Sequence, residues 1–329
     1  MVSPLDVALI CPDKLRSQSK HRLRGCVMLK PLLLAGLALG MMSAASAAPK
    51  RLDLSKPDDA VTAFRKVQCS AKDGESVVYH WVGEVYSRVE GEPDKHLFDL
   101  QGMNIRQCVT VNDPVRGKGV RQVSRELMFY LDPKTGEILR QWQNPWTGKT
   151  VDVVHVANDP VNMRAPLFPI GADGKPYKFE GRIQNGRVFM PAVIPLWYTN
   201  PMGGDYQQYV GNQYHSMEIF DFFVREDDLL DASKPRANAA IAWVRMSPWL
   251  PWMEMTGRGG LLVFNAVGQT LPDGIAGLPK VITDEIAASY PAYTAPPPGD
   301  DARPNETSWT YFKKRADAKR AEARAAAPK

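Results

Sequence analysis

The sequence lacks the short motifs that mark most cofactor-dependent and hydrolytic enzymes. It contains no GxSxG nucleophile elbow, no P-loop and no HExxH pair, and no helix pattern follows the GRGG stretch that starts at Gly257. Its histidines are not spaced as HxH or HxxxH, and its cysteines show no CxxC, haem-attachment or zinc-type spacing. We therefore expect no metal and no bound cofactor.

The apolar run near the N-terminus is too short to cross a membrane. Leu32–Met42 has about 11 residues, whereas a spanning helix needs roughly 20. Lys30 precedes this run and small residues follow it, which completes the pattern of a cleavable signal peptide at residues 28–47. We therefore predict a periplasmic or secreted protein that begins near Ala48, and we interpret residues 1–27 as an over-long gene start.

Net positive charge is lacking in residues 48–310, between the predicted signal peptide and the basic tail. The whole sequence has a net charge of +5 at pH 7. Residues 1–47 contain six basic and two acidic residues and residues 311–329 contain seven and two, so residues 48–310 carry a net charge of −4. We therefore expect no nucleic-acid partner and no stable membrane span, and we expect the basic tail at 311–329 to be helical or disordered.

Cysteine is also scarce, because only Cys69 and Cys108 follow the signal peptide. An oxidising compartment favours a disulfide bond between two such cysteines. The alternative is a pair of buried free thiols, since spacing in the sequence does not establish that the two Cα atoms lie close enough to be bridged.

The body of the chain alternates apolar and polar residues in the manner of β-strands. Turn signals with Pro early and Gly late at Asp132–Gly136 and Asn144–Gly148 indicate an antiparallel meander, and an Asn-Gly pair at 185–186 predicts a tight hairpin. Helix patterns occur at Pro57–Gln68 and Pro279–Ser289. We therefore predict a mainly β fold. It would be a single antiparallel β-barrel, or a barrel-like meander of the lipocalin or calycin type, with one N-terminal and one C-terminal peripheral helix.

Four long segments carry a resemblance to a known family. Tyr130–Asn162, His96–Ile105, Arg245–Phe264 and Arg303–Lys314 resemble sequence motifs of the bacterial domain of unknown function 1838 family. The resemblance covers most of the chain after the signal peptide. It implies a bacterial origin and frequent export, and it transfers no catalytic residue.

Two histidines have acidic residues nearby and are candidates for acid–base catalysis. His155 falls in a predicted strand at about Val151–Val156, and Asp159 follows the strand end, where the rim of a barrel would place it. His215 and Asp205 lie in one Tyr-rich segment. A His beside a carboxylate suits a general base, because its pKa is close to the working pH. The alternative for His155 is a core histidine that bonds a backbone group.

Aromatic residues gather in several segments between the predicted strands. Aromatic rings beside amide, phenol and charged groups suit a largely apolar ligand pocket with a few polar anchors. Ordinary strand composition, or a loop that plugs the end of a barrel, would explain the same residues. The candidate ligand-binding residues are Trp146, Trp197, Tyr198, Tyr206, Tyr209, Trp249, Trp252, Glu254 and Arg258.

Three functions are compatible with these features. The preferred hypothesis is an exported β-barrel that binds a small apolar or aromatic molecule. The second is a cofactor-independent lyase, isomerase or hydrolase that uses the His and carboxylate candidates. The third is an envelope interaction protein that uses the basic tail. Export disfavours chemistry that depends on ATP or NAD, because these cofactors are scarce outside the cytoplasm.

Overall fold

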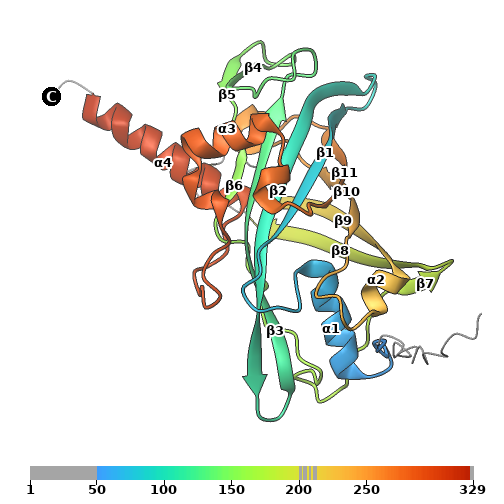
Figure 1. Ribbon diagram of the computed structural model, residues 1–329. Coiled ribbons are helices and arrows are strands. Elements are labelled where there is room, and N and C mark those ends of the chain that lie inside the picture. The colour runs from blue at the N-terminus through green and yellow to red at the C-terminus, as the bar shows by residue number, and fades with distance from the viewer. Residues whose placement is uncertain (1–49, 200–201, 203–205, 207–208, 210–212, 327–329) are drawn as a thin grey trace, which may run out of the picture. The chain divides into compact units, whose positions relative to one another are not determined.

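The described part of the chain is built around one large antiparallel sheet. The computed structural model describes residues 50–199, 202, 206, 209 and 213–326. Its strands are β1 (Val77–Arg88), β2 (Lys95–Asp113), β3 (Gly117–Leu131), β4 (Gln141–Gln143), β5 (Thr150–Asp152), β6 (Val156–Asn158), β7 (Arg182–Gln184), β8 (Arg187–Thr199), β9 (Gln213–Arg225), β10 (Ala240–Ser247) and β11 (Leu261–Thr270). Nine of them form a sheet in the order β6-β3-β2-β1-β11-β10-β9-β8-β7, while β4 and β5 form a separate hairpin (Figure 1).

This sheet confirms the prediction of a mainly β fold, but it does not confirm a closed barrel. In the described part of the chain, β6 and β7 are the two edges of the nine-stranded sheet, and no hydrogen-bonded ladder joins them. All of the ladders are antiparallel, as a meander requires. The fold is therefore an open antiparallel sheet in which most neighbours in sequence are neighbours in space.

The Asn-Gly hairpin is present where the sequence predicts it. Asn185 and Gly186 both have positive φ, at 52° and 71°. Two consecutive residues with positive φ make the type I′ turn, whose twist matches that of the two strands it joins. β7 and β8 accordingly pair directly on either side of this turn.

Four α-helices flank the sheet in the described residues, namely α1 (Pro57–Gln68), α2 (Glu226–Leu230), α3 (Lys280–Ser289) and α4 (Ser308–Ala326). The helices α1 and α3 lie where the sequence predicts them, and α1 begins with Pro at its first position. Lys66 of α1 is buried and donates to three backbone carbonyls of α2 and its C-terminal end, at 2.6–2.9 Å. α3 packs through Ile282 and Ile286 against β1, β2 and β3, on the face of the sheet that carries Val78.

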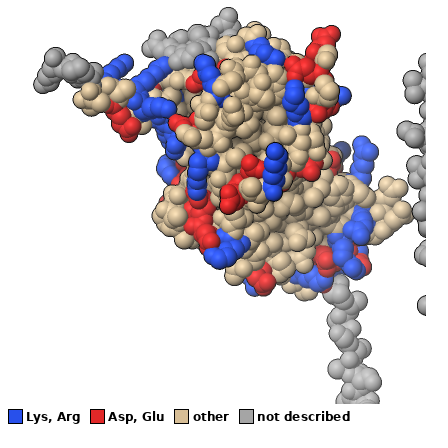
Figure 2. All heavy atoms as spheres, turned by 90° about the horizontal axis from the view of Figure 1, so that it is seen from above, with Lys and Arg blue, Asp and Glu red and all other residues tan. Residues whose placement is uncertain are grey.

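The C-terminal basic segment is a helix that packs on the body of the protein. Trp309 and Phe312 of α4 are buried in the main core cluster. Figure 2 shows acidic and basic side chains mixed over one face, with basic side chains gathered on the side where α4 lies. Among the helices that the structure describes, none is both long enough and apolar enough to cross a membrane.

The structure joins Cys69 and Cys108 in a disulfide bond. The Cα atoms lie 5.8 Å apart, within the usual range for a bridged pair. Cys69 caps the C-terminal end of α1 and Cys108 belongs to β2. The bond therefore fixes α1 against the sheet.

Candidate functional site

The face of the sheet that carries Tyr79 and Trp81 encloses a cavity. Neighbouring strands lie about 4.8 Å apart, so β3 and β9, five steps apart in the sheet order, would be separated by roughly 24 Å in a flat sheet. Glu126 of β3 and Glu218 of β9 nevertheless line the same cavity. The sheet is therefore strongly curled, and we call this inner side the concave face.

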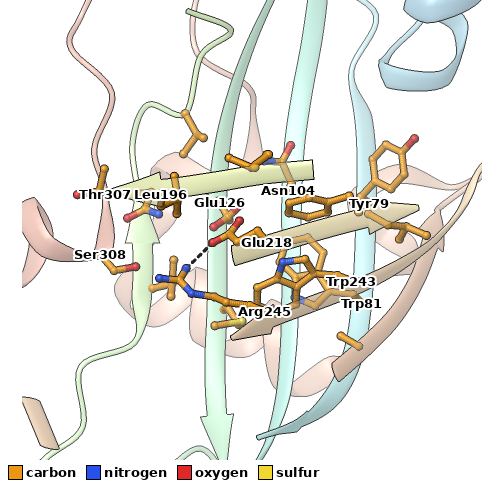
Figure 3. A pocket seen from close by; sticks show the side chains of 18 of the residues that line it. Tyr79, Trp81, Asn104, Glu126, Leu196, Glu218, Trp243, Arg245, Thr307 and Ser308 are labelled. Atoms are coloured by element: carbon orange, nitrogen blue, oxygen red, sulfur yellow. Dashed lines mark hydrogen bonds and ion pairs between the residues drawn. The ribbon is translucent and has the colours of Figure 1, made fainter. Parts of the chain in front are cut away.

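The concave-face cavity has a volume of about 310 Å³, which is in the range of small-molecule sites. The strands β6, β3, β2, β1, β11, β10, β9 and β8 supply most of its wall. Val161, which follows β6, and Glu306–Trp309 at the start of α4 supply the remainder. Figure 3 shows aromatic and charged side chains converging from different strands. The aromatic part of the wall is Tyr79, Trp81, Phe220, Phe222, Trp243 and Trp309, and the polar part includes Asn104, Arg106, Glu126, Asn158, Glu218 and Arg245.

Trp81 lies close to the backbone of the sheet because glycines occupy both neighbouring strands. Gly102 of β2 and Gly268 of β11 pair with Trp81 from its two sides. A Cβ atom at Gly102 would lie 2.3 Å from the indole ring, and one at Gly268 would lie 2.7 Å from the Cβ of Trp81. A side chain at Gly102 would therefore collide with the indole, and one at Gly268 would collide with the His80 carbonyl oxygen, 2.3 Å away, so both positions require glycine.

An ion pair between Arg245 of β10 and Glu218 of β9 forms one part of the polar wall. Nη1 of Arg245 donates to the Glu218 carboxylate at 2.5 Å, and Nη2 donates to the Tyr214 hydroxyl at 2.6 Å. Burial acts against the charge of Arg245, but Tyr214 and Glu218 raise the pKa of Arg245 above its ordinary value. Only 16% of the Arg245 side chain and 15% of the Glu218 side chain are exposed. The pair is therefore an ionic contact that is largely removed from water.

Arg106 of β2 is held in place by neutral groups. Its Nε donates to Asn104 Oδ1 at 2.7 Å, and its Nη1 donates to Gln68 Oε1 at 2.8 Å. The guanidinium carbon lies 4.6 Å from the ring centroid of Tyr79. Burial lowers the pKa of Arg106. These contacts orient the guanidinium group without neutralising its charge.

Glu126 of β3 lies between two amides, because it pairs across the sheet with Asn104 and with Asn158. Burial raises the pKa of Glu126 to about 7, and the nearby charge of Glu218 adds to this shift. Arg106 and Arg245 act in the opposite direction, but each is hydrogen-bonded to other groups. Glu126 therefore gains or loses its proton near neutral pH, beside a Glu218 that is ion-paired (Figure 3).

His155 lies in a different cavity, of about 540 Å³, which we call the His155 cavity. The ring is buried, and its Nδ1 accepts a hydrogen bond from the backbone N–H of Tyr130 at 3.2 Å. Burial and the charge of Arg140 lower the pKa of His155 to about 4. The ring is therefore neutral at pH 7, and its hydrogen is on Nε2. No lone pair is free to take a proton, so the geometry gives the predicted general-base role of His155 no support.

Two carboxylates line the His155 cavity, Asp152 of β5 and Glu285 of α3, and the sequence analysis selected neither of them. Arg140 binds Glu285 with both Nη atoms, at 2.9 and 2.5 Å. Asp159, the predicted partner of His155, forms ion pairs with Arg125 and Arg303, at 3.0 and 2.8 Å. The structure thus gives Asp159 and His155 separate partners.

Only one member of the second predicted catalytic pair, His215, is among the described residues. His215 is exposed, and its ring stacks on Trp197 with centroids 5.0 Å apart. Alternation along β9 places His215 on the side opposite to Glu218, away from the concave face. Asp205 lies outside the described residues.

The predicted ligand-binding residues do not meet in one place. Among those whose side chains are described, none lines the concave-face cavity. Tyr209, Trp252 and Glu254 line a third cavity, of about 810 Å³, beside α4. Trp197 is 75% exposed on the outer side of β8. The side chain of Tyr198 lies outside the description.

The remaining predicted ligand residues hold the loops together. Trp146 and Trp249 pack with ring centroids 4.9 Å apart, and Nε1 of Trp146 donates to Glu92 at 2.9 Å. Arg258 also binds Glu92, at 3.3 Å. The Tyr206 hydroxyl bonds to Asp317 of α4. These contacts favour the alternative in which the aromatic loops are packing elements.

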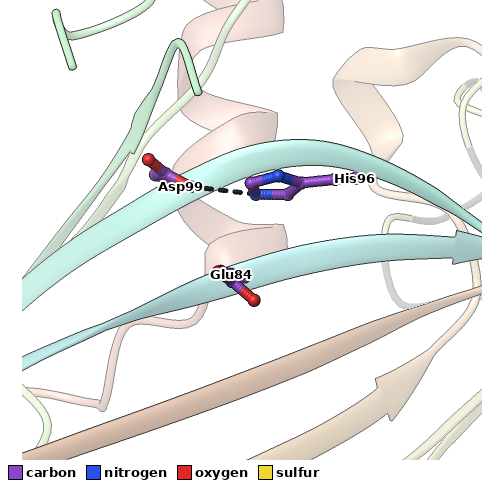
Figure 4. Close-up of side chains that lie close together, drawn as sticks. All are labelled: Glu84, His96 and Asp99. Carbon is purple, nitrogen blue, oxygen red and sulfur yellow. Dashed lines mark ion pairs between the residues drawn. The ribbon is translucent and has the colours of Figure 1, made fainter. Parts of the chain in front are cut away.

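One cluster on the outer side of the sheet has the residue types of a metal site (Figure 4). The nearest ligand atoms of Glu84, His96 and Asp99 all lie within 4.8 Å of one another. His96 Nε2 is 2.9 Å from Asp99, and the Tyr86 hydroxyl donates to Glu84 at 2.6 Å. Glu84 and His96 are exposed. Each of the three potential ligand groups already has a protein partner. The cluster is therefore explained as a surface ion pair beside a hydrogen-bonded carboxylate.

The sequence analysis missed Glu126, Arg106 and Asn104, although a signal for them is present. In a half-buried strand, the residues that share a face with Trp and Tyr are normally apolar. Glu126 alternates with Met128, and Arg106 lies on the same face of β2 as Gly102. Charged residues on the apolar side of several successive strands are the pattern that marks a polar group inside a β fold.

Comparison with known protein families shows which family the region around the site matches. Residues 74–316 match the family described as "Protein of unknown function (DUF1838)". No curated protein matches the sequence, and no solved structure matches the fold. All nine strands of the large sheet lie within the matched residues, so the concave face belongs to the matched region.

Proposed function

The chain belongs to the DUF1838 family, and from this premise we propose that its concave-face cavity binds a small organic molecule with an apolar or aromatic body and a polar end. One observation carries the proposal. A partly open cavity of about 310 Å³ has aromatic side chains on its wall and a group of amides and ionic side chains beside them. Small-molecule sites have this composition, in which apolar surface supplies affinity and a few polar groups fix orientation.

The polar groups support a ligand that carries a hydrogen-bonding group. Buried polar atoms normally have a hydrogen-bond partner. Within the described residues, Oδ1 of Asn158 has none, although the side chain lines the cavity. Glu126 offers either a donor or an acceptor near neutral pH, because burial raises its pKa to about 7. A ligand with an N–H or O–H group on a planar aromatic body fits this wall.

The proposal is tested by filling the cavity from its edge. Ile194 of β8 lines the cavity and is 40% exposed, whereas its neighbour Val193 points to the other side of the sheet and is 57% exposed. Ile194→Trp places an indole ring inside the cavity, and Val193→Trp places the same ring on the opposite face of the sheet, outside the cavity. Binding of indole, 2-naphthol and 5-nitroindazole would be measured by isothermal titration calorimetry.

We expect at least one of these arenes to bind the unmodified protein. Ile194→Trp should weaken that binding by about 10-fold or more, since an occupied cavity no longer offers apolar surface. Val193→Trp should leave it unchanged. Absence of binding to all three arenes, or an equal loss in both variants, would contradict the proposal.

We also propose that the protein is exported and processed at Ala48. The disulfide between Cys69 and Cys108 supports this, because such bonds persist in oxidising compartments. Mass spectrometry of the protein recovered from the periplasm or medium should give an N-terminus at Ala48. Recovery of a chain that still begins at Met1 or Met28, in the cytoplasm, would contradict export.

The finer fold assignment is likewise part of this proposal. The curled meander has its cavity on the concave face, and a lipocalin-type barrel has its ligand cavity in the lumen. This similarity supports a calycin-like relationship. The role of α4 as an envelope-binding tail has less support. Lys319 of α4 binds Asp152 at 3.1 Å, and Phe312 is buried against Tyr209. The helix is therefore engaged with the body of the protein.

A further inference from the structure

We propose that Glu126 is a catalytic proton-transfer group, which removes a proton from a molecule bound in the concave-face cavity and returns it at another atom of that molecule. The inference rests on the proposed binding function and adds an activity to it. The substrate class is an aromatic or carbonyl compound with an acidic C–H, N–H or O–H bond. The reaction class is a cofactor-independent isomerisation.

The first support is the difference between Glu126 and the two other carboxyl groups of the cavity, Glu218 and Glu306, each of which is paired with a cation. Glu218 is tied to Arg245 at 2.5 Å, and Arg245 is also held by Tyr214. Glu126 is flanked across the sheet by Asn104 and Asn158. Two carboxyl groups whose surroundings differ in this way take different roles, one staying ionised and the other exchanging a proton.

The second support is the charge around Glu126 from every side of the cavity. Burial is the largest influence, and together with Glu218 it raises the pKa of Glu126 to about 7. A base is most effective when its pKa is near the operating pH, because it is then both available and strong. The charged and titratable groups that line the same cavity are Arg106 of β2, Glu218 of β9, Arg245 of β10, Tyr79 of β1 and, just before α4, Glu306.

The third support is that positive charge is available where negative charge would develop. When Glu126 takes a proton, the bond to hydrogen breaks and its electron pair remains on the ligand as an enolate-type anion. Arg106 is oriented only by neutral groups in its described contacts, so its charge can stabilise such an anion. Return of the proton from Glu126 to a second ligand atom completes an isomerisation. No oxidant, reductant or other co-reactant is needed.

A generic probe for this chemistry is 5-nitrobenzisoxazole. A base removes the proton on its C3 atom, the C–H electron pair forms the third bond of a nitrile, and the N–O bond breaks. The N–O electron pair leaves on oxygen, which gives the coloured 2-cyano-4-nitrophenolate. The related 5-nitroindazole has nearly the same outline but cannot open its ring, so it reports binding without reaction.

We expect the unmodified protein to accelerate this ring opening, with a rate that rises with pH through one ionisation near 7. Glu126→Gln should lower the rate by about 100-fold or more, since it removes the base. It should still bind 5-nitroindazole with an affinity within a few-fold of the unmodified protein. Glu126→Asp should restore part of the rate. The matched control is Glu84→Gln, on the outer side of the same sheet, which should leave the rate unchanged.

The outcomes separate the two proposals. If 5-nitroindazole binds but the unmodified protein opens the ring no faster than Glu126→Gln, the catalytic inference is overturned and the binding function stands. A rate that follows an ionisation near 4 to 5 would also overturn it, because the base would then be an ordinary surface carboxylate. If indole, 2-naphthol and 5-nitroindazole all fail to bind, the binding function fails and the catalytic inference fails with it.

Discussion

The concave-face cavity and the His155 cavity both enclose ionisable side chains, but they treat charge in opposite ways. In the His155 cavity, Glu285 is held by both Nη atoms of Arg140. His155 is neutral there, with its Nδ1 bonded to a backbone N–H. In the concave-face cavity, Glu218 and Glu306 are each paired with a cation, whereas Glu126 lies between amides. Only the second arrangement leaves a group that changes its charge near pH 7.

This difference shows that burial alone does not make a functional group. Desolvation is the largest cause of the shift for both Glu126 and His155. It raises the pKa of an acid and lowers the pKa of a base, because it disfavours the charged form in each case. For His155 the result is a group that is inert at neutral pH. For Glu126 the same effect moves the pKa toward neutral pH.

The largest effect is expected from removing Arg245, the cation that pairs with Glu218 in the concave-face cavity. Arg245→Met leaves Glu218 in a largely buried position without its partner, at 15% exposure. Breaking a buried ion pair on one side costs about 3 to 5 kcal/mol of unfolding free energy. Urea denaturation at pH 7 would measure the loss.

Two further variants make this test specific. Lys280→Met removes the cation of a surface ion pair with Asp284 on α3, in which the two side chains are 86% and 61% exposed. We expect a loss of about 1 kcal/mol or less there, because water screens an exposed pair. Adding Glu218→Gln to Arg245→Met should recover much of the larger loss. Equal losses for Lys280→Met and Arg245→Met would show that the Arg245 pair behaves as a surface ion pair.

The next effect concerns stability as a function of pH. The pKa of Glu126 is raised from 4.5 to about 7, so its contribution to stability is complete below pH 4.5 and is lost as the pH rises through 7. Glu126→Gln should therefore stabilise the protein by on the order of 3 kcal/mol at pH 8 and by much less at pH 4.5. Urea denaturation at the two pH values would measure the difference. A gain that does not change with pH would show that Glu126 titrates normally.

The sequence predicted the elements of this fold better than its site, for a physical reason. Turns and helix ends depend on a few adjacent residues, and the hairpin at Asn185 and the start of α1 at Pro57 lie where local rules place them. The curl of the sheet depends on contacts between strands. Gly102 and Gly268 make room for Trp81 only once the register of three strands is known. The sequence therefore did not show whether the sheet closes.

The site was missed because its members are far apart in the sequence. Glu126 and Glu218 are brought together only by the curl. The residues that sequence reasoning preferred stood out through local composition, as in the segment with Trp249 and Trp252. Rings of that kind are often used for packing, and Trp252 is buried against Phe98. A charged residue on the apolar side of a strand was the better signal.

The smallest of the three effects is expected from His155, and its sign is opposite to that of Glu126. The pKa of His155 is lowered from 6.5 to about 4. The contribution of the neutral ring to the free energy of unfolding is therefore complete above pH 6.5 and is lost as the pH falls through 4. His155→Asn keeps an acceptor for the Tyr130 N–H and removes the titration. Between pH 7 and pH 5 this variant should lose about 2 kcal/mol less stability than the unmodified protein. Urea denaturation at both pH values would measure this, with Glu126→Gln in parallel. If the two variants changed the pH dependence in the same direction, the contrast between the two cavities would be wrong.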